Sequence, residues 1–169
     1  MPPSIRPIAT SALDDAFGLL QTVARWLDGK GRRQRIAATT RETYLRWQSD
    51  GCNWGVFHGE QLAAIFTLVR EPLHDWPDVE VSGAVPWLRA LAVDPARRGQ
   101  GIGGHGIRAS LALVDAGEHL WLDCVSDFLP GYYAEHGFEY VARQTRTYPD
   151  GAYDITLMRQ PGRRAPVIG

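Results

Sequence analysis

Lysine is almost missing from this sequence, because Lys30 is the only lysine among its 18 basic residues. A phosphate-binding loop that depends on a lysine is thereby excluded, since no Gly-Lys-Ser or Gly-Lys-Thr occurs. An excess of one charge is missing too, because 19 acidic residues leave a formal net charge of −1. The chain as a whole lacks the basic footprint of a nucleic-acid-binding protein, and we expect no nucleic-acid partner.

Cysteine is scarce as well, and the two cysteines have no paired spacing. Cys52 and Cys124 lie in apolar, strand-like runs, which predicts two reduced, buried thiols in a cytoplasmic protein. The five histidines show no metal-ligand spacing, so we expect no metal. Apolar runs of membrane-spanning length and an N-terminal signal pattern are also missing, so we expect no membrane partner.

What the sequence does contain is the composition of an ordinary globular domain, with 44% apolar and 22% charged residues in a length of 169. A chain of that length can bury a real core. We therefore predict a single domain over residues 1–160, followed by a flexible tail at residues 161–169.

The order of the hydrophobic patterns predicts a mixed α/β fold. Apolar or alternating runs indicate strands at residues 4–8, 52–57, 62–69, 87–93, 120–125, 138–142 and 153–158. Helical spacing indicates helices at residues 11–29, 39–50, 103–116 and 130–136. Ser11 with Asp14, and Thr39 with Glu42, are predicted as helix capping pairs. We expect a mixed sheet with helices on both faces.

The most informative segment follows the strand at residues 87–93. Pro95 breaks that strand, and glycines are dense where the next helix must begin, in the segment Arg98, Gly99, Gln100, Gly101, Ile102, Gly103 and Gly104. The start of a helix has free N–H groups and the positive end of the helix dipole. Glycines let a phosphate approach this backbone closely, so the pattern predicts a diphosphate site made of main-chain amides.

Two other readings of these glycines stay open. Gly99, Gly101 and Gly104 also satisfy the G-x-G-x-x-G pattern of a dinucleotide-binding fold, and Asp123 lies about 20 residues further on, at a strand end. Against this reading, a connection with Asp-Pro separates the strand from the glycines, and no room is left for further parallel βαβ units. The other reading is a glycine-rich turn that binds nothing, at a considerable cost in backbone entropy.

The segment resembles the acetyl-coenzyme A signature of the GCN5-related N-acetyltransferase (GNAT) superfamily, Arg/Gln-x-x-Gly-x-Gly/Ala. The preceding Leu-Ala-Val-Asp-Pro and the later Tyr-Tyr-Ala-Glu-His-Gly-Phe match the family as well. The resemblance implies the GNAT-like acyl-CoA N-acyltransferase fold, with a mostly antiparallel sheet splayed between its fourth and fifth strands. It also implies acetyl-CoA as the acyl-donor substrate, with the pyrophosphate wrapped by residues 98–104 and the pantetheine arm paired with the backbone of Leu91, Ala92 and Val93.

The same resemblance suggests catalytic residues. Tyr133 lies four residues before Gly137, where the family has a tyrosine that protonates the departing thiolate. Many relatives carry the general base as a glutamate in the strand before the glycine loop, but this chain has Arg89 there. Glu80 of the preceding loop is our candidate instead, and the same loop offers three alternatives, Glu71, His74 and Asp78. Relatives often place an asparagine against the coenzyme after the next strand, and Asp127 is our candidate for that contact.

The acceptor is less well defined. In the family, the loop between the first two helices borders the acceptor, and here this loop carries Lys30, Arg32, Arg33 and Arg35. These residues indicate an acceptor with carboxylate or phosphate groups, or else an ordinary solvated loop. We expect a primary amine, on a small molecule or a protein, that attacks the thioester directly in a ternary complex. A homodimer is also compatible with the sequence. The missing strand glutamate leaves an alternative function, a coenzyme-binding module that senses or regulates without turnover.

Overall fold

The computed structural model describes residues 1–32 and 35–165. Its helices are α1 (Leu13–Gly29), α2 (Arg41–Ser49), α3 (Ile102–Ala112) and α4 (Leu129–Glu135), with short 3-10 turns at Thr10–Ala12, Arg35–Ala38 and Pro95–Arg97. Its strands are β1 (Ser4–Pro7), β2 (Asn53–His58), β3 (Gln61–Glu71), β4 (Val85–Val93), β5 (His119–Val125), β6 (Glu139–Tyr148) and β7 (Gly151–Pro161). These elements form two compact units: unit 1 holds residues 1–69 and 88–110, and unit 2 holds residues 70–87 and those from 111 onward.

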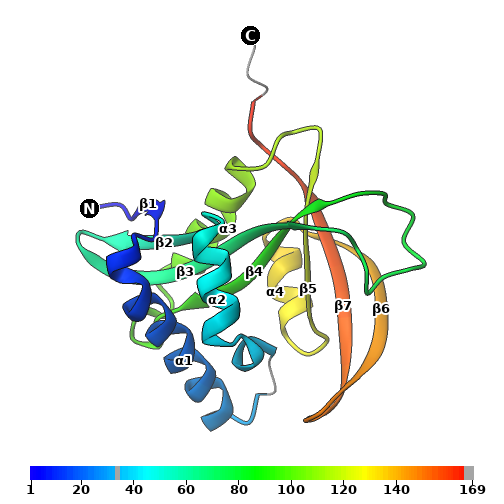
Figure 1. Cartoon of the computed structure of the whole chain (residues 1–169), viewed down its shortest axis with the longest axis horizontal. Coiled ribbons are helices and arrows are strands. Elements are labelled where there is room, and N and C mark those ends of the chain that lie inside the picture. Colours follow the sequence, from blue (N-terminus) through cyan, green and yellow to red (C-terminus); the bar gives the residue numbers. More distant parts are fainter. Residues whose placement is uncertain (33–34, 166–169) are drawn as a thin grey trace. The chain divides into compact units, whose positions relative to one another are not determined.

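The strands form the mixed sheet that we expect from the sequence. In the described residues, seven strands hydrogen-bond in the order β1-β2-β3-β4-β5-β7-β6 (Figure 1). The runs β1-β2-β3 and β5-β7-β6 are antiparallel, whereas β4 and β5 pair in parallel with Trp87 opposite Trp121. This arrangement confirms the mixed α/β class and the mostly antiparallel sheet.

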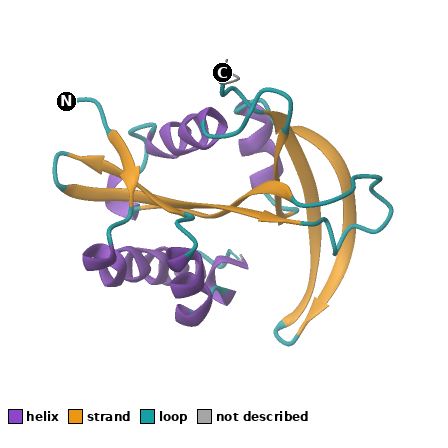
Figure 2. Ribbon diagram, turned by 45° about the horizontal axis from the view of Figure 1, so that its top comes forward, coloured by secondary structure: helices purple, strands orange, loops and turns teal. Residues whose placement is uncertain are grey.

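In unit 1, helices cover both faces of the strands (Figure 2). Phe57, Ile65 and Ala92 of β2, β3 and β4 belong to one buried cluster with the apolar side of α1. Because side chains alternate along a strand, the neighbouring residues point to the opposite face. There α3 approaches closely, since a Cβ added at Gly106 would lie 3.1 Å from Leu91 Cδ1.

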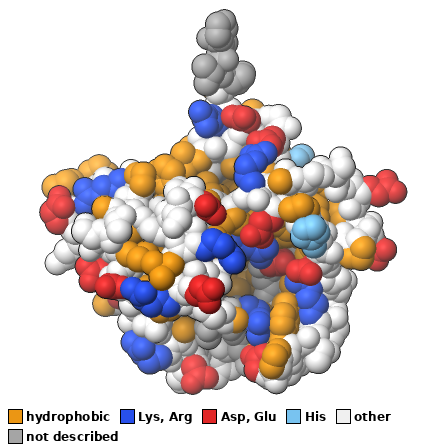
Figure 3. Space-filling model, viewed as in Figure 1, with side chains coloured by type: hydrophobic (Ala, Val, Ile, Leu, Met, Phe, Trp, Pro, Cys, Tyr) orange, Lys and Arg blue, Asp and Glu red, His pale blue; other side chains and the backbone are white. Residues whose placement is uncertain are grey.

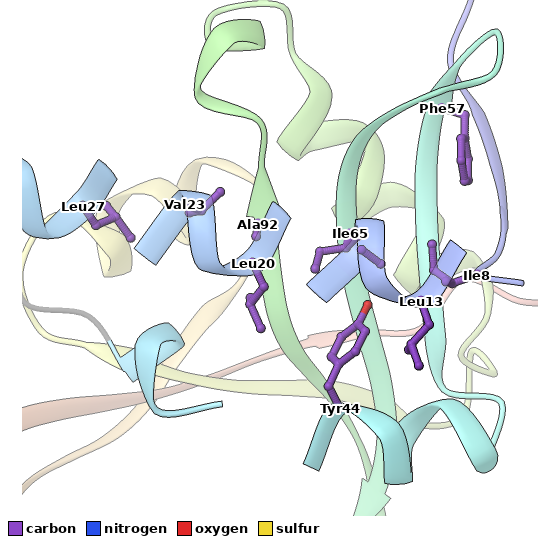
Figure 4. Packing of buried hydrophobic residues seen from close by; sticks show 10 residues of the cluster. Ile8, Leu13, Leu20, Val23, Leu27, Tyr44, Phe57, Ile65 and Ala92 are labelled. Atoms are coloured by element: carbon purple, nitrogen blue, oxygen red, sulfur yellow. The ribbon is translucent and has the colours of Figure 1, made fainter. Parts of the chain in front are cut away.

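Tyr44 of α2 stands inside the same cluster with its hydroxyl pointing toward β3 (Figure 4). The residue is fully buried, and its hydroxyl has no hydrogen-bond partner among the described residues. Burial raises the pKa of Tyr44 above its ordinary value, because the ionised form would be poorly solvated. The core of unit 1 therefore contains a polar atom that its surroundings do not satisfy.

We expect Tyr44→Phe to raise the free energy of unfolding by about 1 kcal/mol, because it removes an unsatisfied buried hydroxyl without changing the shape of the ring. Urea unfolding measures the change. Tyr153→Phe is the matched control, since the hydroxyl of this buried tyrosine donates to Asp150 Oδ2 at 2.5 Å. The control should lose stability, and a loss at Tyr44 as well would show that its hydroxyl is satisfied in solution.

The two predicted capping pairs are displaced in the structure. Ser11 lies inside the 3-10 turn Thr10–Ala12, so its backbone is already helical, and the residue before α1, Ala12, offers no side-chain cap. At α2 the cap is Thr40 rather than Thr39, and its hydroxyl accepts from the Thr43 N–H at 3.1 Å. Either of the two adjacent threonines could cap the helix, and the extended backbone of Thr40 makes it the capping residue.

In unit 2, the last hairpin is longer than the sequence suggests. Strands predicted at residues 138–142 and 153–158 extend as β6 and β7 to Tyr148 and Pro161. Polar side chains on the exposed face hide this extension from hydrophobic patterning, since Arg143 and Thr145 of β6 both donate to Asp154 of β7. The tail predicted from residue 161 thus begins with the last residue of β7, and residues 166–169 lie outside the described part.

Helices α1, α2 and α4 all end in the same way. Each is followed by a glycine in the left-handed region, where a side chain would be strained: Gly31, Gly51 and Gly137, with φ of 66°, 70° and 93°.

None of the described helices combines the length and the apolar composition that a membrane-spanning helix requires.

Candidate functional site

The β4 strand is distorted just before the residues predicted to bind a coenzyme arm. Ala90 has φ of 49°, and it is the one non-glycine residue with positive φ in the described part of the chain. Such a conformation costs about 1–2 kcal/mol for a residue with a side chain, and inside a strand it is typical of a bulge. The sequence gives no sign of it, because alanine is not a residue that favours this region.

The connection from β4 to α3 is held firmly. The Asp94 N–H donates to the Ala63 carbonyl at 2.9 Å, and Asp94 Oδ1 accepts from the Ala96 N–H at 3.0 Å. Arg97 then binds the β2-β3 hairpin through His58 Nδ1 at 3.2 Å and through Gln61. The chain therefore enters the glycine segment from a fixed position.

The glycine segment opens the first turn of α3. Gly99 and Gly101 have φ of 76° and 73°, which only glycine adopts without strain, and a Cβ at either position would meet open space. The first helical bond runs from the His105 N–H to the Gly101 carbonyl at 3.1 Å. The amides before it have no acceptor inside the helix, so the segment presents several N–H groups at the positive end of the helix dipole.

Arg98 begins the segment and lies over an aromatic ring of α1. Its guanidinium carbon is 4.3 Å from the centroid of the Trp26 ring, a cation–π distance. A guanidinium held flat on an aromatic ring still has its in-plane N–H donors available at the edges. Arg98 can thus add positive charge to the amides of the glycine segment.

The remaining predicted binding residues of unit 1 differ in what they can offer. Ala92 and Ile102 are 1% and 2% exposed, so their side chains belong to the core and only their backbones can serve a ligand. Leu91 and Val93 are half-buried, and Gln100 is exposed. The structure therefore places residues 91–93 of β4 and the segment 98–104 in unit 1, joined by the braced connection.

Tyr133 lies in unit 2, in the last turn of α4, and the end of this helix fixes its position. The Phe138 N–H donates to the Tyr133 carbonyl at 3.1 Å, and the Gly137 N–H donates to the Ala134 carbonyl at 3.0 Å. These two bonds, with the glycine at positive φ, form a Schellman motif. Phe138 also packs edge-on against the Tyr133 ring, with centroids 5.7 Å apart. The spacing Tyr-x-x-x-Gly-Phe therefore describes one helix end.

The phenol of Tyr133 stays protonated at neutral pH. Burial raises its pKa above the ordinary value, with smaller contributions from Cys124 and Tyr132. Its hydroxyl makes no hydrogen bond among the described residues. Cys124 is also buried, and burial together with the charges of Asp123 and Asp127 raises the pKa of its thiol to about 12. The phenol of Tyr133 can thus donate a proton, whereas Cys124 is a neutral thiol.

Asp127 and Glu80 lie in unit 2 as well. Asp127 is exposed at the start of α4, where its Oδ1 accepts from the Leu129 N–H at 3.1 Å. Glu80 is exposed in the loop between β3 and β4. Neither position tests the predicted role in coenzyme binding or as general base, and both roles stay predictions.

A network that the sequence analysis missed anchors the loop of Glu80. Trp76, 3% exposed, donates from Nε1 to Asp123 Oδ2 of β5 at 3.3 Å. Arg146 of β6 also reaches this oxygen at 3.4 Å, and its guanidinium carbon lies 4.7 Å from the Trp76 ring centroid. The side chains of Asp123 and Arg146 are 14% and 16% exposed, so this ion pair is largely buried. It brings together three residues that are far apart in the sequence.

Other predicted features carry less structural information. Arg33 of the predicted acceptor loop lies outside the described residues. Cys52 is half-buried rather than buried, and neither Cys52 nor Cys124 forms a disulfide in the described part of the chain. Within residues 1–32 and 35–165, no cluster of three or more His, Cys, Asp or Glu side chains is placed to hold a metal ion. Basic and acidic side chains are interspersed on the face in Figure 3.

Known proteins resemble this chain in sequence and in fold. Among solved structures, a ribosomal-protein-S18-alanine N-acetyltransferase from Escherichia coli is 19% identical with a TM-score of 0.65, over 99% of this chain and 98% of that one. A GNAT-family acetyltransferase from Listeria monocytogenes is 18% identical with a TM-score of 0.73, over 94% and 95%. An N-acetyltransferase from Staphylococcus aureus is 13% identical with a TM-score of 0.72, over 95% and 98%. At these identities the likeness supports the fold alone.

No curated protein matches the sequence. The model of the acetyltransferase (GNAT) family, however, matches residues 20–138, which include α3, the glycine segment and the Tyr-x-x-x-Gly-Phe helix end. This match confirms the resemblance inferred from the glycine segment. The chain belongs to the acetyltransferase (GNAT) family.

Proposed function

We propose that this protein is an N-acetyltransferase that moves an acetyl group from acetyl-CoA to a primary amine. The observation that carries the proposal is the start of α3, where Gly99 and Gly101 at positive φ precede amides without helical acceptors. Each hydrogen bond to a charged group contributes about 1.5–3 kcal/mol, so several amides can hold a pyrophosphate without a lysine. Arg98, stacked on Trp26, supplies a full positive charge beside them.

The residues of β4 fit the arm of the same substrate. Leu91, Ala92 and Val93 precede the glycine segment directly, and their backbone groups are proposed to pair with the pantetheine amides as a further strand would. The positive φ of Ala90 interrupts the regular strand conformation just before these residues, and a bulge of this kind would free N–H and C=O groups for the coenzyme. Asp127 is proposed as a further contact of the coenzyme.

The acceptor must lose a proton before it can attack the thioester carbon. A lysine-like amine has a pKa of about 10.4, so fewer than about one molecule in a thousand is nucleophilic at neutral pH. Glu80 is our candidate for taking this proton, directly or through water. The amine lone pair then forms the C–N bond to the thioester carbon in a ternary complex, which gives a tetrahedral intermediate. As this intermediate collapses, the C–S bond breaks, the nitrogen releases its second proton to water, and Tyr133 protonates the departing thiolate and regains a proton from water.

We expect Tyr133→Phe to lower turnover about tenfold to a hundredfold and to leave the affinity for acetyl-CoA unchanged. A positioned acid typically contributes about 10²–10⁴, and a thiolate with a pKa near 8.5 is already a fair leaving group, so the effect should lie at the low end. Tyr132→Phe is the control, because this neighbour shares α4 and an edge-on ring contact with Tyr133. Equal turnover of the Tyr133 variant and the wild type would remove the phenol from the mechanism.

The proposed acceptor is a primary amine, on a small molecule or on a protein. The name of the Escherichia coli neighbour gives a protein alanine as the acceptor of that enzyme. In this chain, the basic residues Lys30, Arg32 and Arg35 favour an acceptor that also carries a carboxylate or phosphate.

A second function is favoured by Arg89, which lies in β4 at the place where the family often has the glutamate that acts as general base. A chain without an effective base would bind acyl-CoA and regulate rather than turn over. Release of free thiol from acetyl-CoA, measured with a panel of small amines and peptides, distinguishes the two functions. Release with any acceptor supports the enzyme, whereas calorimetric binding of acetyl-CoA without release on the whole panel would support the regulatory module.

A further inference from the structure

Two pairs of basic side chains flank the glycine segment in unit 1. Arg97 meets His58 Nδ1 at 3.2 Å, and Arg108 meets His105 Nδ1 at 3.1 Å. Burial lowers the pKa of His105, and the charges of Arg108 and His58 lower it further. We call this set, His58, Arg97, His105 and Arg108, the basic cluster.

The sequence itself places the basic cluster at both ends of the glycine segment. Arg97 is the residue immediately before Arg98, and His105 is the residue immediately after Gly104. His58 comes from the end of β2, and the bonds of Arg97 to the β2-β3 hairpin hold it there. The cluster is therefore attached to the same rigid connection that positions the proposed pyrophosphate site.

The protonation pattern of the basic cluster favours an anion. An arginine can only donate, so each histidine accepts at Nδ1 and carries its proton on Nε2. Neither Nε2 has a hydrogen-bond partner among the described residues. The cluster thus offers two guanidinium groups and two imidazole N–H donors. Its two acceptors, the Nδ1 atoms of the histidines, are already occupied by the arginines.

Acidic side chains offset this charge only in part. Asp94 Oδ2 lies 4.0 Å from Arg97 Nε, and Glu60 of the neighbouring turn pairs with Arg6 instead, at 3.2 Å. Arg108 is exposed and has no acidic partner within the described residues. Such an arrangement of donors around unneutralised positive charge is typical of a phosphate site.

We propose that the basic cluster binds the 3′-phosphate of coenzyme A, and that it makes the protein discriminate coenzyme A from its 3′-dephospho form. The inference rests on the proposed function, because it requires the coenzyme diphosphate to lie on the glycine segment. Coenzyme A carries its 3′-phosphate on the same ribose as the diphosphate, so the two phosphate sites must be neighbours. Arg97 and His105 meet this requirement from the two ends of the segment.

Calorimetric titration of the full chain with coenzyme A and with 3′-dephospho-coenzyme A tests the inference. We expect the wild type to bind coenzyme A at least about tenfold more tightly, the effect of one good charge-assisted contact. Arg108→Gln should bring the two affinities close together by weakening coenzyme A alone. Arg25→Gln is the matched control, since Arg25 is also an exposed helical arginine that contacts the residue three positions before it, Thr22 at 3.3 Å.

Each outcome has a distinct meaning. Equal binding of the two coenzymes by the wild type would overturn the inference and leave the proposed function intact. A preference that persists unchanged in Arg108→Gln would overturn the assignment to the basic cluster. If neither coenzyme binds, the proposed function and the inference fail together. Competition by adenosine 3′,5′-bisphosphate but not by ADP would support the inference in the wild type, independently of any variant.

Discussion

Replacing Asp123 by alanine is expected to lower the free energy of unfolding by about 2–3 kcal/mol, because it removes the buried partner of Arg146 and leaves only the exposed carboxylate of Asp75, 3.8 Å away. The Arg146 side chain is 16% exposed, and its Nε already lacks a hydrogen-bond partner among the described residues. The substitution also removes the acceptor of the Trp76 indole N–H. The loop that carries Glu80 would then lose an anchor on β5. Chemical unfolding of the variant measures the effect.

Two further variants show whether burial is the cause. Asp154→Ala removes the carboxylate of an exposed pair with Arg143 at 2.7 Å, and we expect a much smaller loss of stability than for Asp123→Ala. The double variant Asp123→Leu with Arg146→Met replaces both charges by apolar groups, so it should recover most of the stability that the single variant loses. A loss at Asp123 as small as that at Asp154 would contradict the burial argument.

Replacing Gly101 by glutamate is expected to weaken the binding of coenzyme A at least about a thousandfold, because several charge-assisted hydrogen bonds would be lost together. Any side chain is strained at φ of 73°, and this one would place a negative charge at the start of α3. A carboxylate there competes for the amides that the diphosphate needs and repels the diphosphate itself. Calorimetric titration with coenzyme A measures the loss.

Gly51→Glu separates the loss of the site from the strain of the substitution. Gly51 belongs to the same unit, has φ of 70°, and would likewise direct a Cβ into open space. We expect this control to lose stability by about 1–2 kcal/mol and to bind coenzyme A as the wild type does. Unchanged binding by the Gly101 variant would remove the glycine segment as the coenzyme site.

The sequence was sufficient to predict the features that depend on neighbouring residues. The glycine segment, the Pro95 break and the order of strands and helices all arise from local backbone preferences, and the structure reproduces them. The Schellman end of α4 is equally local, so Tyr133 could be located from Gly137 alone.

Features that depend on contacts between distant segments could not be predicted. In the sequence, Asp123 is only a polar residue in a predicted strand, and no short-range pattern links it to Arg146. The two residues meet in the folded chain, where β6 carries Arg146 to the side chain of Asp123. His58 is separated by many residues from Arg97, so the basic cluster appears only once the β2-β3 hairpin lies beside the β4-α3 connection. The strained backbone at Ala90 has no signature because its cause is tertiary.

Because α4 ends in a Schellman motif, only one part of the sequence Tyr-x-x-x-Gly-Phe can be informative about catalysis. Gly137 serves the fold, because φ of 93° would strain any residue with a side chain, and Phe138 serves it through the edge-on contact of its ring with Tyr133. A descendant that had abandoned catalysis would still be selected to keep both residues. The hydroxyl of Tyr133 has no such structural role, because it makes no hydrogen bond among the described residues. With the role proposed for Tyr133, a change to phenylalanine at this position would remove the acid of the reaction and leave the end of α4 intact.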